Sequence, residues 1–557
     1  MRAYIEKHPY LTIIILWFFV FTAHLGTLYP NIMEARNFVT AREMITDGNW
    51  ILTTMDGLPR YEKPPLPTWL TAASAQVFGL DNIAALRLPA AIVTLALLFM
   101  MYSLSRSIVT QKFMQCEVEV RELTNDKLYA LITTLILGTS FYIIFAGRNG
   151  TWDIFAHSFM LIGIYFLFQL FELKSANYKN ALLAGLFIGL SFMSKGPVSH
   201  YALLLPFLIA YGFIYKFKGF HKKWLPIILM IVLIAALSSW WAIYIYQMDT
   251  AEATRIAEKE SSRWIGYELK PFYYYWSFFT QSGIWTIPAF ICLLYPYLKS
   301  RVSNLKAYQF ALLWTVAAVV LLSLIPTKKS RYLLPVLIPL AMTVGFYIQF
   351  LFNNFHSLTS KLEKWPVYFN YGLIATIGIA FPLGAFLYFG DNLDGNYFFY
   401  ILSSIALFAT GVFIFYQLRK KNFALTFYGT VAFVMLVMSL GFPLSEALLG
   451  NPTYNSISVL KESETPVYVL NDLAPEMVWD YGKASIKITK EELINREALQ
   501  EIGILTYPSI EKNSLDFLKE KYRVEWKETF DLNPVDSSKN SYKNRLKNDY
   551  YIISRKK

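Results

Sequence analysis

The chain has 557 residues, of which 55% are hydrophobic, 17% aromatic and only 16% charged, whereas soluble domains carry about 25% charged residues. This composition excludes an ordinary soluble protein and indicates a polytopic membrane protein. The formal net charge of +12 is spread over loops beside hydrophobic stretches, so it indicates contact with membrane lipids and argues against a nucleic-acid partner.

Apolar stretches of about 17 to 25 residues, long enough to cross a lipid hydrocarbon layer, recur along most of the chain. Roughly thirteen such spans can be counted from the hydrophobic pattern. We therefore predict an α-helical polytopic transmembrane domain over residues 1–444. The predicted spans cover residues 11–28, 83–102, 128–146, 154–173, 181–193, 201–215, 225–245, 272–298, 310–325, 332–352, 370–388, 398–416 and 424–440.

The orientation of these spans follows from the distribution of basic residues. No small-residue cleavage site follows the first apolar stretch, so we interpret it as a retained span rather than a signal peptide. Short loops after the even-numbered spans carry basic clusters, for example Lys222 and Lys223, which predicts that these loops and the N-terminus are cytoplasmic. An odd number of spans then places the hydrophilic tail outside the cytoplasm. The expected location is the plasma membrane, in a bacterium the inner membrane.

The first predicted extracytoplasmic loop, residues 30–69, is charged although it lies between two hydrophobic spans. Asn31 followed three residues later by Glu34 is typical of a helix cap. Residues 33–45 are expected to form a helix along the membrane interface, and a surface helix that merely closes the loop is the alternative. This loop is the predicted catalytic loop.

Prolines stiffen the end of the same loop. Pro64, Pro65 and Pro67 restrict the backbone directly after Glu62 and Lys63. We therefore expect these two side chains to be presented from a rigid turn, which suits a lysine that binds phosphate.

Basic residues are unusually frequent in loops predicted to be extracytoplasmic, where Lys and Arg are normally scarce. Arginine forks onto phosphate oxygens and lysine adds a point charge, so converging cations beside the bilayer favour a phosphate or pyrophosphate ligand. Snorkelling to lipid headgroups is the alternative for any single residue. These residues are Arg36, Arg42, Arg60, Lys63, Arg148, Lys195, Arg255, Lys259, Arg263, Lys328, Lys329 and Arg331.

Acidic residues in these loops are candidates for a general base or a metal ligand. Two of them, Glu34 and Asp153, also occupy positions that suit a helix N-terminus, where negative charge is favoured, and a capping role does not exclude a functional one. The acidic set is Glu34, Glu43, Asp56, Glu62, Asp153, Glu258 and Glu260.

The hydrophilic tail, residues 445–557, has a different pattern. Strand-like runs at 466–470, 502–506 and 550–553 alternate with helix-like runs at 490–498 and 514–522, which predicts a small extracytoplasmic α/β domain. It contains no glycine-rich phosphate loop, metal-ligand spacing or nucleophile elbow. We expect this domain to cap the site or to cover the substrate.

Several motifs together resemble polyprenyl-phosphate-dependent glycosyltransferases of the GT-C fold. The order MEARNFVTAREM (33–44), DGNW (47–50) and RYEKPPLPTWL (60–70) is similar to the first extracytoplasmic loop of these enzymes. The relatives it resembles are the lipid A aminoarabinose transferases and, more distantly, the dolichyl-phosphate-mannose protein mannosyltransferases. Further matching motifs are GTWD at 150–153, FMSKG at 192–196 and TKKSRYLLP at 327–335.

This resemblance implies roles for individual residues. Lys63 matches the lysine that binds the donor phosphate, with Arg36 and Arg263 as partners and Tyr332 near the same phosphate. Asp153 matches the aspartate that opens the fourth span. The residues implied in supporting positions are Glu62, Lys195, Lys328 and Arg331.

The chain departs from the family at two positions. Met33-Glu34 stands where the family usually has an Asp-Glu pair. The first candidate for the base is therefore Glu34 and the second is Asp153. The remaining option is an acceptor that needs no base. Glu260 lies near a position where aminoarabinose transferases carry a histidine. Inheritance of their metal site is therefore open: a divalent metal is the one possible cofactor, with Glu62 and Glu260 as its candidate ligands.

The resemblance implies a membrane glycosyltransferase that moves a sugar from a polyprenyl-phosphate donor to an extracytoplasmic acceptor: lipid A, a glycan or a protein. The alternative is a transporter or flippase for a lipid-linked anion. Transporters often contain inverted repeats, whereas this sequence shows no internal repeat and gathers its polar residues at one membrane face. The pattern therefore favours the enzyme.

Overall fold

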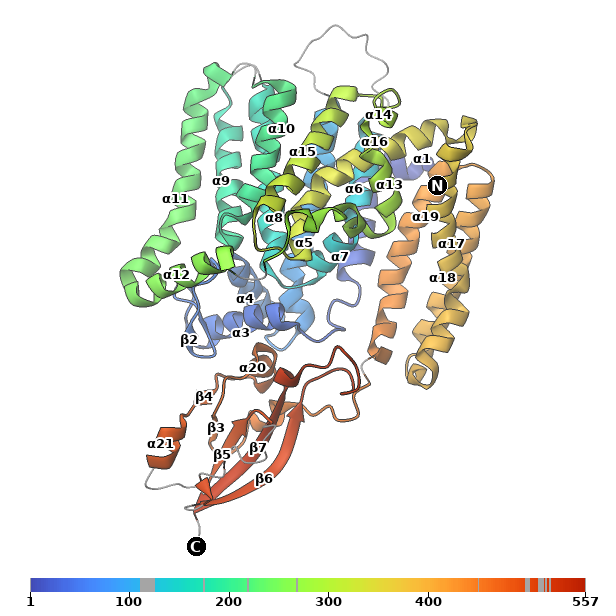
Figure 1. Ribbon diagram of the computed structural model, residues 1–557. Helices are drawn as coiled ribbons and strands as arrows, with labels where there is room; N and C mark the ends of the chain where they lie inside the picture. Colours follow the sequence, from blue (N-terminus) through green and yellow to red (C-terminus); the bar gives the residue numbers. More distant parts are fainter. Residues whose placement is uncertain are drawn as a thin grey trace.

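The computed structural model describes residues 2–110, 126–173, 176–217, 220–266, 269–448, 450–495, 501–508, 515, 518, 519 and 522–555. Of residues 220, 221, 263–265, 391 and 448 it describes the backbone only. A helical bundle forms most of the molecule, and a smaller domain with a β-sheet lies beyond one end of it (Figure 1).

Within the described residues, eight helices are long and apolar enough to cross a membrane, or nine if one bent pair counts as a single span. The prediction of an α-helical polytopic membrane protein is thus confirmed. The eight spans are α5 (Ile83–Thr110), α8 (Trp152–Glu172), α11 (Trp224–Met248), α15 (Leu305–Leu324), the helical run Ser330–Ser357 that contains α16 (Leu337–Asn354), α17 (Lys361–Phe389), α18 (Tyr397–Arg419) and the helical run Phe423–Ala447 that begins with α19 (Phe423–Leu436). Shorter helices fill the bundle: α1 (Arg2–Lys7), α2 (Pro9–Trp17), α6 (Asp126–Gly138), α7 (Phe141–Arg148), α9 (Tyr178–Lys195) and α10 (Leu205–Tyr215).

Two predicted spans are not straight helices. Helices α6 and α7 meet at a bend of 66°. Residues 272–298 form two 3-10 segments, Phe272–Tyr275 and Phe278–Trp285, followed by the short helices α13 (Thr286–Cys292) and α14 (Tyr295–Leu298). Gly283 interrupts this region with a φ of 68°, a conformation that glycine adopts without steric cost. Hydropathy alone therefore mistook an irregular apolar segment for one span.

The loop predicted to be catalytic folds at the end of the bundle that faces the sheet domain. It contains helix α3 (Ile32–Thr46), a hairpin of β1 (Thr54–Met55) and β2 (Leu58–Pro59), and the start of helix α4 (Leu66–Phe78). The predicted cap is present, because the Asn31 side chain accepts from the backbone of Met33 and Glu34 and the Glu34 side chain accepts in return. Most of α3 is buried, since α4 packs against it and so does the sheet domain through α20 (Pro475–Tyr481).

The C-terminal domain contains a five-stranded mixed sheet, as the α/β prediction required. Its strand order is β4-β3-β5-β7-β6, with β3 parallel to β4 and β5 and with β7 antiparallel to β5 and β6. The strands are β3 (Val467–Val469), β4 (Ile486–Lys487), β5 (Ile502–Thr506), β6 (Tyr522–Asp531) and β7 (Lys547–Arg555).

The helix predicted at 490–498 appears as α21 (Lys490–Asn495), and its last residues, like most of the helix predicted at 514–522, lie outside the described residues. The N-terminus and the C-terminal domain lie at opposite ends of the bundle (Figure 1).

Candidate active site

A cavity of about 1430 Å³ lies between the end of the bundle and the C-terminal domain. Its walls come from α3, the β1–β2 hairpin, residues 60–64, the ends of α8, α9 and α15, helix α12 (Thr250–Gly266), residues 327–332 and the C-terminal domain. Among the side chains that the structure describes, nine basic ones line it against five acidic ones. The basic residues are Arg36, Arg60, Lys63, Lys195, Arg255, Lys259, Lys329, Arg331 and Lys487, and the acidic residues are Asp56, Glu62, Glu252, Glu260 and Asp472.

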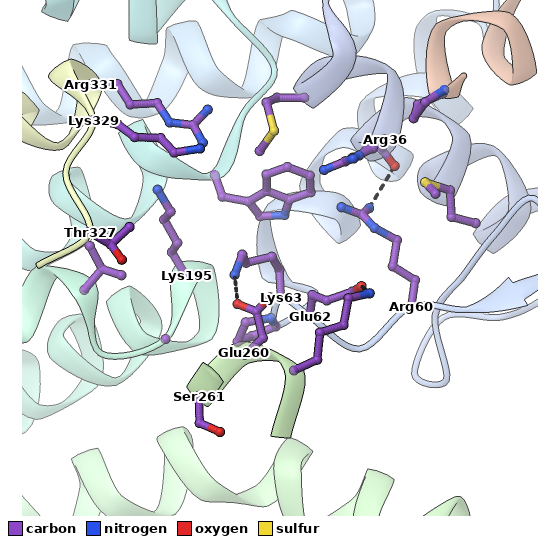
Figure 2. Close-up of a pocket in the computed structure, with 18 of the residues that line it drawn as sticks. Arg36, Arg60, Glu62, Lys63, Lys195, Glu260, Ser261, Thr327, Lys329 and Arg331 are labelled. Carbon is purple, nitrogen blue, oxygen red and sulfur yellow. Dashed lines mark hydrogen bonds and ion pairs between the residues drawn. The ribbon is translucent and has the colours of Figure 1, made fainter. Parts of the chain in front are cut away.

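Lys63 lines this cavity from the segment that directly precedes Pro64 and Pro65 (Figure 2). Its Nζ lies 3.1 Å from Oε2 of Glu260 on α12. The preceding residue forms a matching contact, since Oε1 of Glu62 lies 3.4 Å from Nζ of Lys259. The Lys63 and Glu260 side chains retain 28% and 26% of their exposure, so this ion pair is accessible from the cavity and exchangeable for an anionic ligand.

A second group of cations lines another side of the same cavity. Figure 2 shows Lys195, Lys329 and Arg331 on one side of the cavity, opposite Arg36 and Arg60. Nζ of Lys195 is paired with Asp153 at the start of α8 and lies 5.9 Å from the ring centroid of Tyr332. Nε of Arg331 is buried without a hydrogen-bond partner among the described residues. A buried donor of this kind is satisfied when an anion binds beside it.

Arg60 is a cavity residue to which the sequence assigned no individual role. Its Nη1 donates to the backbone oxygen of Arg36 and to Oγ1 of Thr40, both at 2.9 Å, and its Cζ lies 4.9 Å from the ring centroid of Trp152. Burial lowers the pKa of Arg60 to about 10, so it is charged at neutral pH. The sequence signals for it were its place among the basic residues of the predicted extracytoplasmic loops and its position as the first residue of the RYEKPP motif.

Glu34, the first choice for a base, is instead a structural residue. Its side chain is 1% exposed and forms a buried ion pair with Arg87 at 2.7 Å. It also accepts from the backbone nitrogens of Asn31 and Gly150. Met33, its neighbour, lines the cavity, whereas Glu34 does not. The cap predicted from the spacing is present, but its carboxylate is directed into the protein.

Lys328 and Arg263, two cations predicted to belong to the site, are not among the side chains that line the cavity in the part of the chain that the structure describes. Lys328 does not line the cavity, because its Nζ donates to the backbone oxygens of Ile325 and Lys270 at 2.6 and 3.0 Å. It joins its own loop to the segment at Lys270, and its neighbour Lys329 faces the cavity instead. Arg263 belongs to α12, but its side chain lies outside the described residues.

The suggested metal ligands do not fit a metal site. Glu62 and Glu260 are each paired with a lysine, and a divalent cation would have to displace both ammonium groups. Among the described residues, no group of three or more His, Cys, Asp and Glu side chains is placed to hold a metal ion. We therefore assign no step to a metal.

Comparison with known proteins agrees with this architecture. Residues 119–241 match the family model described as dolichyl-phosphate-mannose-protein mannosyltransferase. The undecaprenyl phosphate-alpha-4-amino-4-deoxy-L-arabinose arabinosyl transferase of Shewanella sediminis is 26% identical over 342 residues, which are 58% of this chain and 56% of that protein. The protein of the same description from Pectobacterium atrosepticum is 25% identical over 482 residues, 82% of this chain and 80% of that one. For several relatives of this description, the match spans little more than half of the relative's length.

Among solved structures, ArnT from Cupriavidus metallidurans bound to undecaprenyl phosphate superimposes with a TM-score of 0.63 at 16% identity, covering 97% of this chain and 96% of ArnT. The apo state of the same protein gives a TM-score of 0.62 at 14% identity, covering 99% and 98%. The chain therefore has the GT-C fold of these membrane proteins, and its sequence resembles the aminoarabinose transferases, as the motifs of its first loop predicted.

Proposed function

We propose that this protein is an integral membrane glycosyltransferase that moves a sugar from a polyprenyl-phosphate donor to an acceptor outside the cytoplasm. The observation that carries the proposal is the excess of cations around one cavity at the end of a membrane bundle. A lipid-linked phosphate reaches such a site from the bilayer while its chain remains in lipid. The names of the similar transferases make an undecaprenyl-phosphate sugar the first donor to test.

In the proposed reaction, the bond between the anomeric carbon and the phosphate oxygen breaks, and the phosphate leaves with the electron pair. A bond forms between the same carbon and the acceptor oxygen. Lys63, Lys195 and Arg331 surround the cavity and are positioned to stabilise the charge on the departing phosphate. Fixed cations in a site shielded from water contribute most where charge develops in the transition state.

Asp153 acts in this scheme through Lys195, to which it is paired. It is therefore a positioning residue, and it does not line the cavity. A hydroxyl acceptor would release its proton to a carboxylate that does line the cavity, Glu62 or Glu260. An acceptor that is already ionised needs no base.

The orientation and the division of the chain belong to the same proposal. We place the N-terminus in the cytoplasm and the C-terminal domain, residues 445–557, outside it. The positive-inside distribution of loop charges supports this assignment, and so does the position of the two regions at opposite ends of the bundle. Labelling of single cysteines at Lys299 and Ser538 with an impermeant reagent tests it, since only the second position should react in intact cells.

The decisive experiment mixes purified protein in detergent with an undecaprenyl-phosphate sugar and candidate acceptors, without any gradient or second compartment. Mass spectrometry should detect the glycosylated acceptor and free undecaprenyl phosphate. A transporter would produce neither product under these conditions. Comparison of glycolipids and glycoproteins from cells with and without the protein then identifies the sugar and the acceptor.

A further inference from the structure

The β1–β2 hairpin is a tight turn set between the bundle and the C-terminal domain. Its two central residues, Asp56 and Gly57, have φ values of 58° and 71°. Two consecutive positive values are typical of a type I′ hairpin turn, for which Asp-Gly is a preferred sequence. The turn therefore holds the Asp56 side chain in a defined direction.

Glu43 on α3 holds this hairpin from the inside. Its side chain is buried; Oε1 accepts from the Asp56 backbone nitrogen at 2.7 Å and Oε2 accepts from Oγ1 of Thr54 at 2.6 Å. Burial raises the pKa of Glu43, because the charged carboxylate is removed from water. The hairpin is thus attached to α3 through a group that no proposed catalytic step uses.

The other face of the hairpin binds the C-terminal domain. Oδ1 of Asp56 accepts from the backbone nitrogen of Ser485 at 2.6 Å, and Oδ2 accepts from Oγ of Ser485 at 2.7 Å. These two bonds join the turn to the residue directly before β4. Hydrogen bonds to a charged acceptor are stronger than those between neutral groups.

Helix α3 supplies a second attachment to the same domain. The guanidinium of Arg42 donates to the backbone oxygens of Val478 and Trp479 near the end of α20, at 3.2 Å, where helix carbonyls lack intrahelical partners. Val39 on α3 belongs to the apolar core of the C-terminal domain. The domain is therefore docked against the loop by both polar and apolar contacts.

This docking completes the cavity. Asp472, Leu473, Pro475, Val478 and Lys487 of the C-terminal domain line it opposite the bundle. The donor lipid remains in the membrane, and Lys63, Lys195 and Arg331 belong to the bundle. The wall formed by the C-terminal domain is therefore the side of the cavity on which we expect the acceptor to bind.

We propose that Asp56 is a positioning residue that seats the C-terminal domain on the hairpin and thereby sets the acceptor side of the cavity. This inference rests on the proposed glycosyl transfer and adds a role for the C-terminal domain within it. Loss of the Asp56–Ser485 contact should weaken use of the acceptor while the donor phosphate binds as before.

The test compares Ser485→Ala and Asp56→Asn with the control Ser538→Ala, an exposed serine of the same domain. Asparagine tolerates a positive φ, so Asp56→Asn keeps the turn while one oxygen becomes an amide nitrogen. The acceptor KM, the Kd of undecaprenyl phosphate and hydrogen exchange of residues 54–60 and 475–487 are measured for each full-length protein. We expect the acceptor KM to rise about five- to tenfold, which is about 1.0–1.4 kcal/mol, with faster exchange in both segments and a Kd changed less than about twofold.

Either of two results overturns the proposal: kinetics and exchange equal to those of Ser538→Ala, or a loss of donor affinity as large as the loss of acceptor affinity. Hydrogen exchange also tests the docking role of Asp56 independently of whether the protein transfers a sugar. If the wild-type protein transfers no sugar, the proposed function fails. Unchanged exchange in Ser485→Ala and Asp56→Asn would then refute the docking role independently.

Discussion

Two glutamates of the same loop, Glu34 and Glu62, show how differently one charged segment is used. Glu34 is 1% exposed and is paired with Arg87, which is 5% exposed. Glu62 is 24% exposed, and its Oε1 lies 3.4 Å from Nζ of Lys259, another residue that lines the cavity. The first carboxylate has no freedom to change partners, whereas the second borders the space where a ligand binds. Burial and the number of hydrogen-bond partners thus distinguish a carboxylate that stabilises the fold from one that can contact a ligand.

The contrast predicts that Glu34 matters for folding. Glu34→Ala leaves Arg87 buried without its carboxylate, and breaking such a pair from one side costs about 3–5 kcal/mol. We expect a large fall in the temperature of thermal unfolding in detergent. The double variant Glu34→Ala with Arg87→Met should recover part of the loss, because no unpaired charge remains. Unchanged stability together with lost activity would return Glu34 to the list of candidate bases.

Lys63 represents the opposite case, a cation with a functional role and a small structural one. Lys63→Ala should lower transfer by about 10²–10³-fold, the usual effect of removing one group that stabilises transition-state charge. Its unfolding temperature should stay close to that of the wild type, because the Glu260 pair is partly exposed. Lys299→Ala, an exposed lysine in a predicted cytoplasmic loop, is the matched control. Near-normal transfer by Lys63→Ala would refute phosphate binding at this residue.

Asp153 lies between these extremes, because it is largely buried but holds a cavity residue. Asp153→Asn removes the charge that orients Lys195, and a hydrogen bond to a charged group contributes about 1.5–3 kcal/mol. We expect transfer to fall about 10- to 100-fold, measured as kcat/KM for the donor. If Lys195→Ala in the Asp153→Asn background causes a further loss as large as in the wild type, the two residues do not act together.

Glu62 should show the smallest effect. Exposed ion pairs contribute about 0–1 kcal/mol, so Glu62→Gln should change stability and donor affinity only slightly, less than about fivefold in Kd. A binding assay with undecaprenyl phosphate measures this directly. A large loss of kcat with unchanged Kd would instead identify Glu62 as the base for a hydroxyl acceptor.

Local features of the site were predictable from the sequence. The Asn31–Glu34 cap follows from a spacing of three residues, and the rigid presentation of Lys63 follows from the adjacent prolines, since both depend on neighbours along the chain. The choice between Lys328 and Lys329 was not predictable. Adjacent lysines have the same composition and hydropathy, and only the folded backbone directs Lys328 to carbonyls of its own loop and Lys329 to the cavity.

The sequence by itself determined the membrane class, the α/β character of the tail and the motifs that identify the fold, because hydropathy, alternation and motif order are properties of the linear chain. The tertiary structure decided which charged side chains are bound to partners within the protein. It brought Glu34 to Arg87, 53 residues away along the chain, and Asp56 to Ser485, 429 residues away. Such pairs depend on how distant elements pack, and therefore only the fold separates the groups that hold the site together from those that face its ligand.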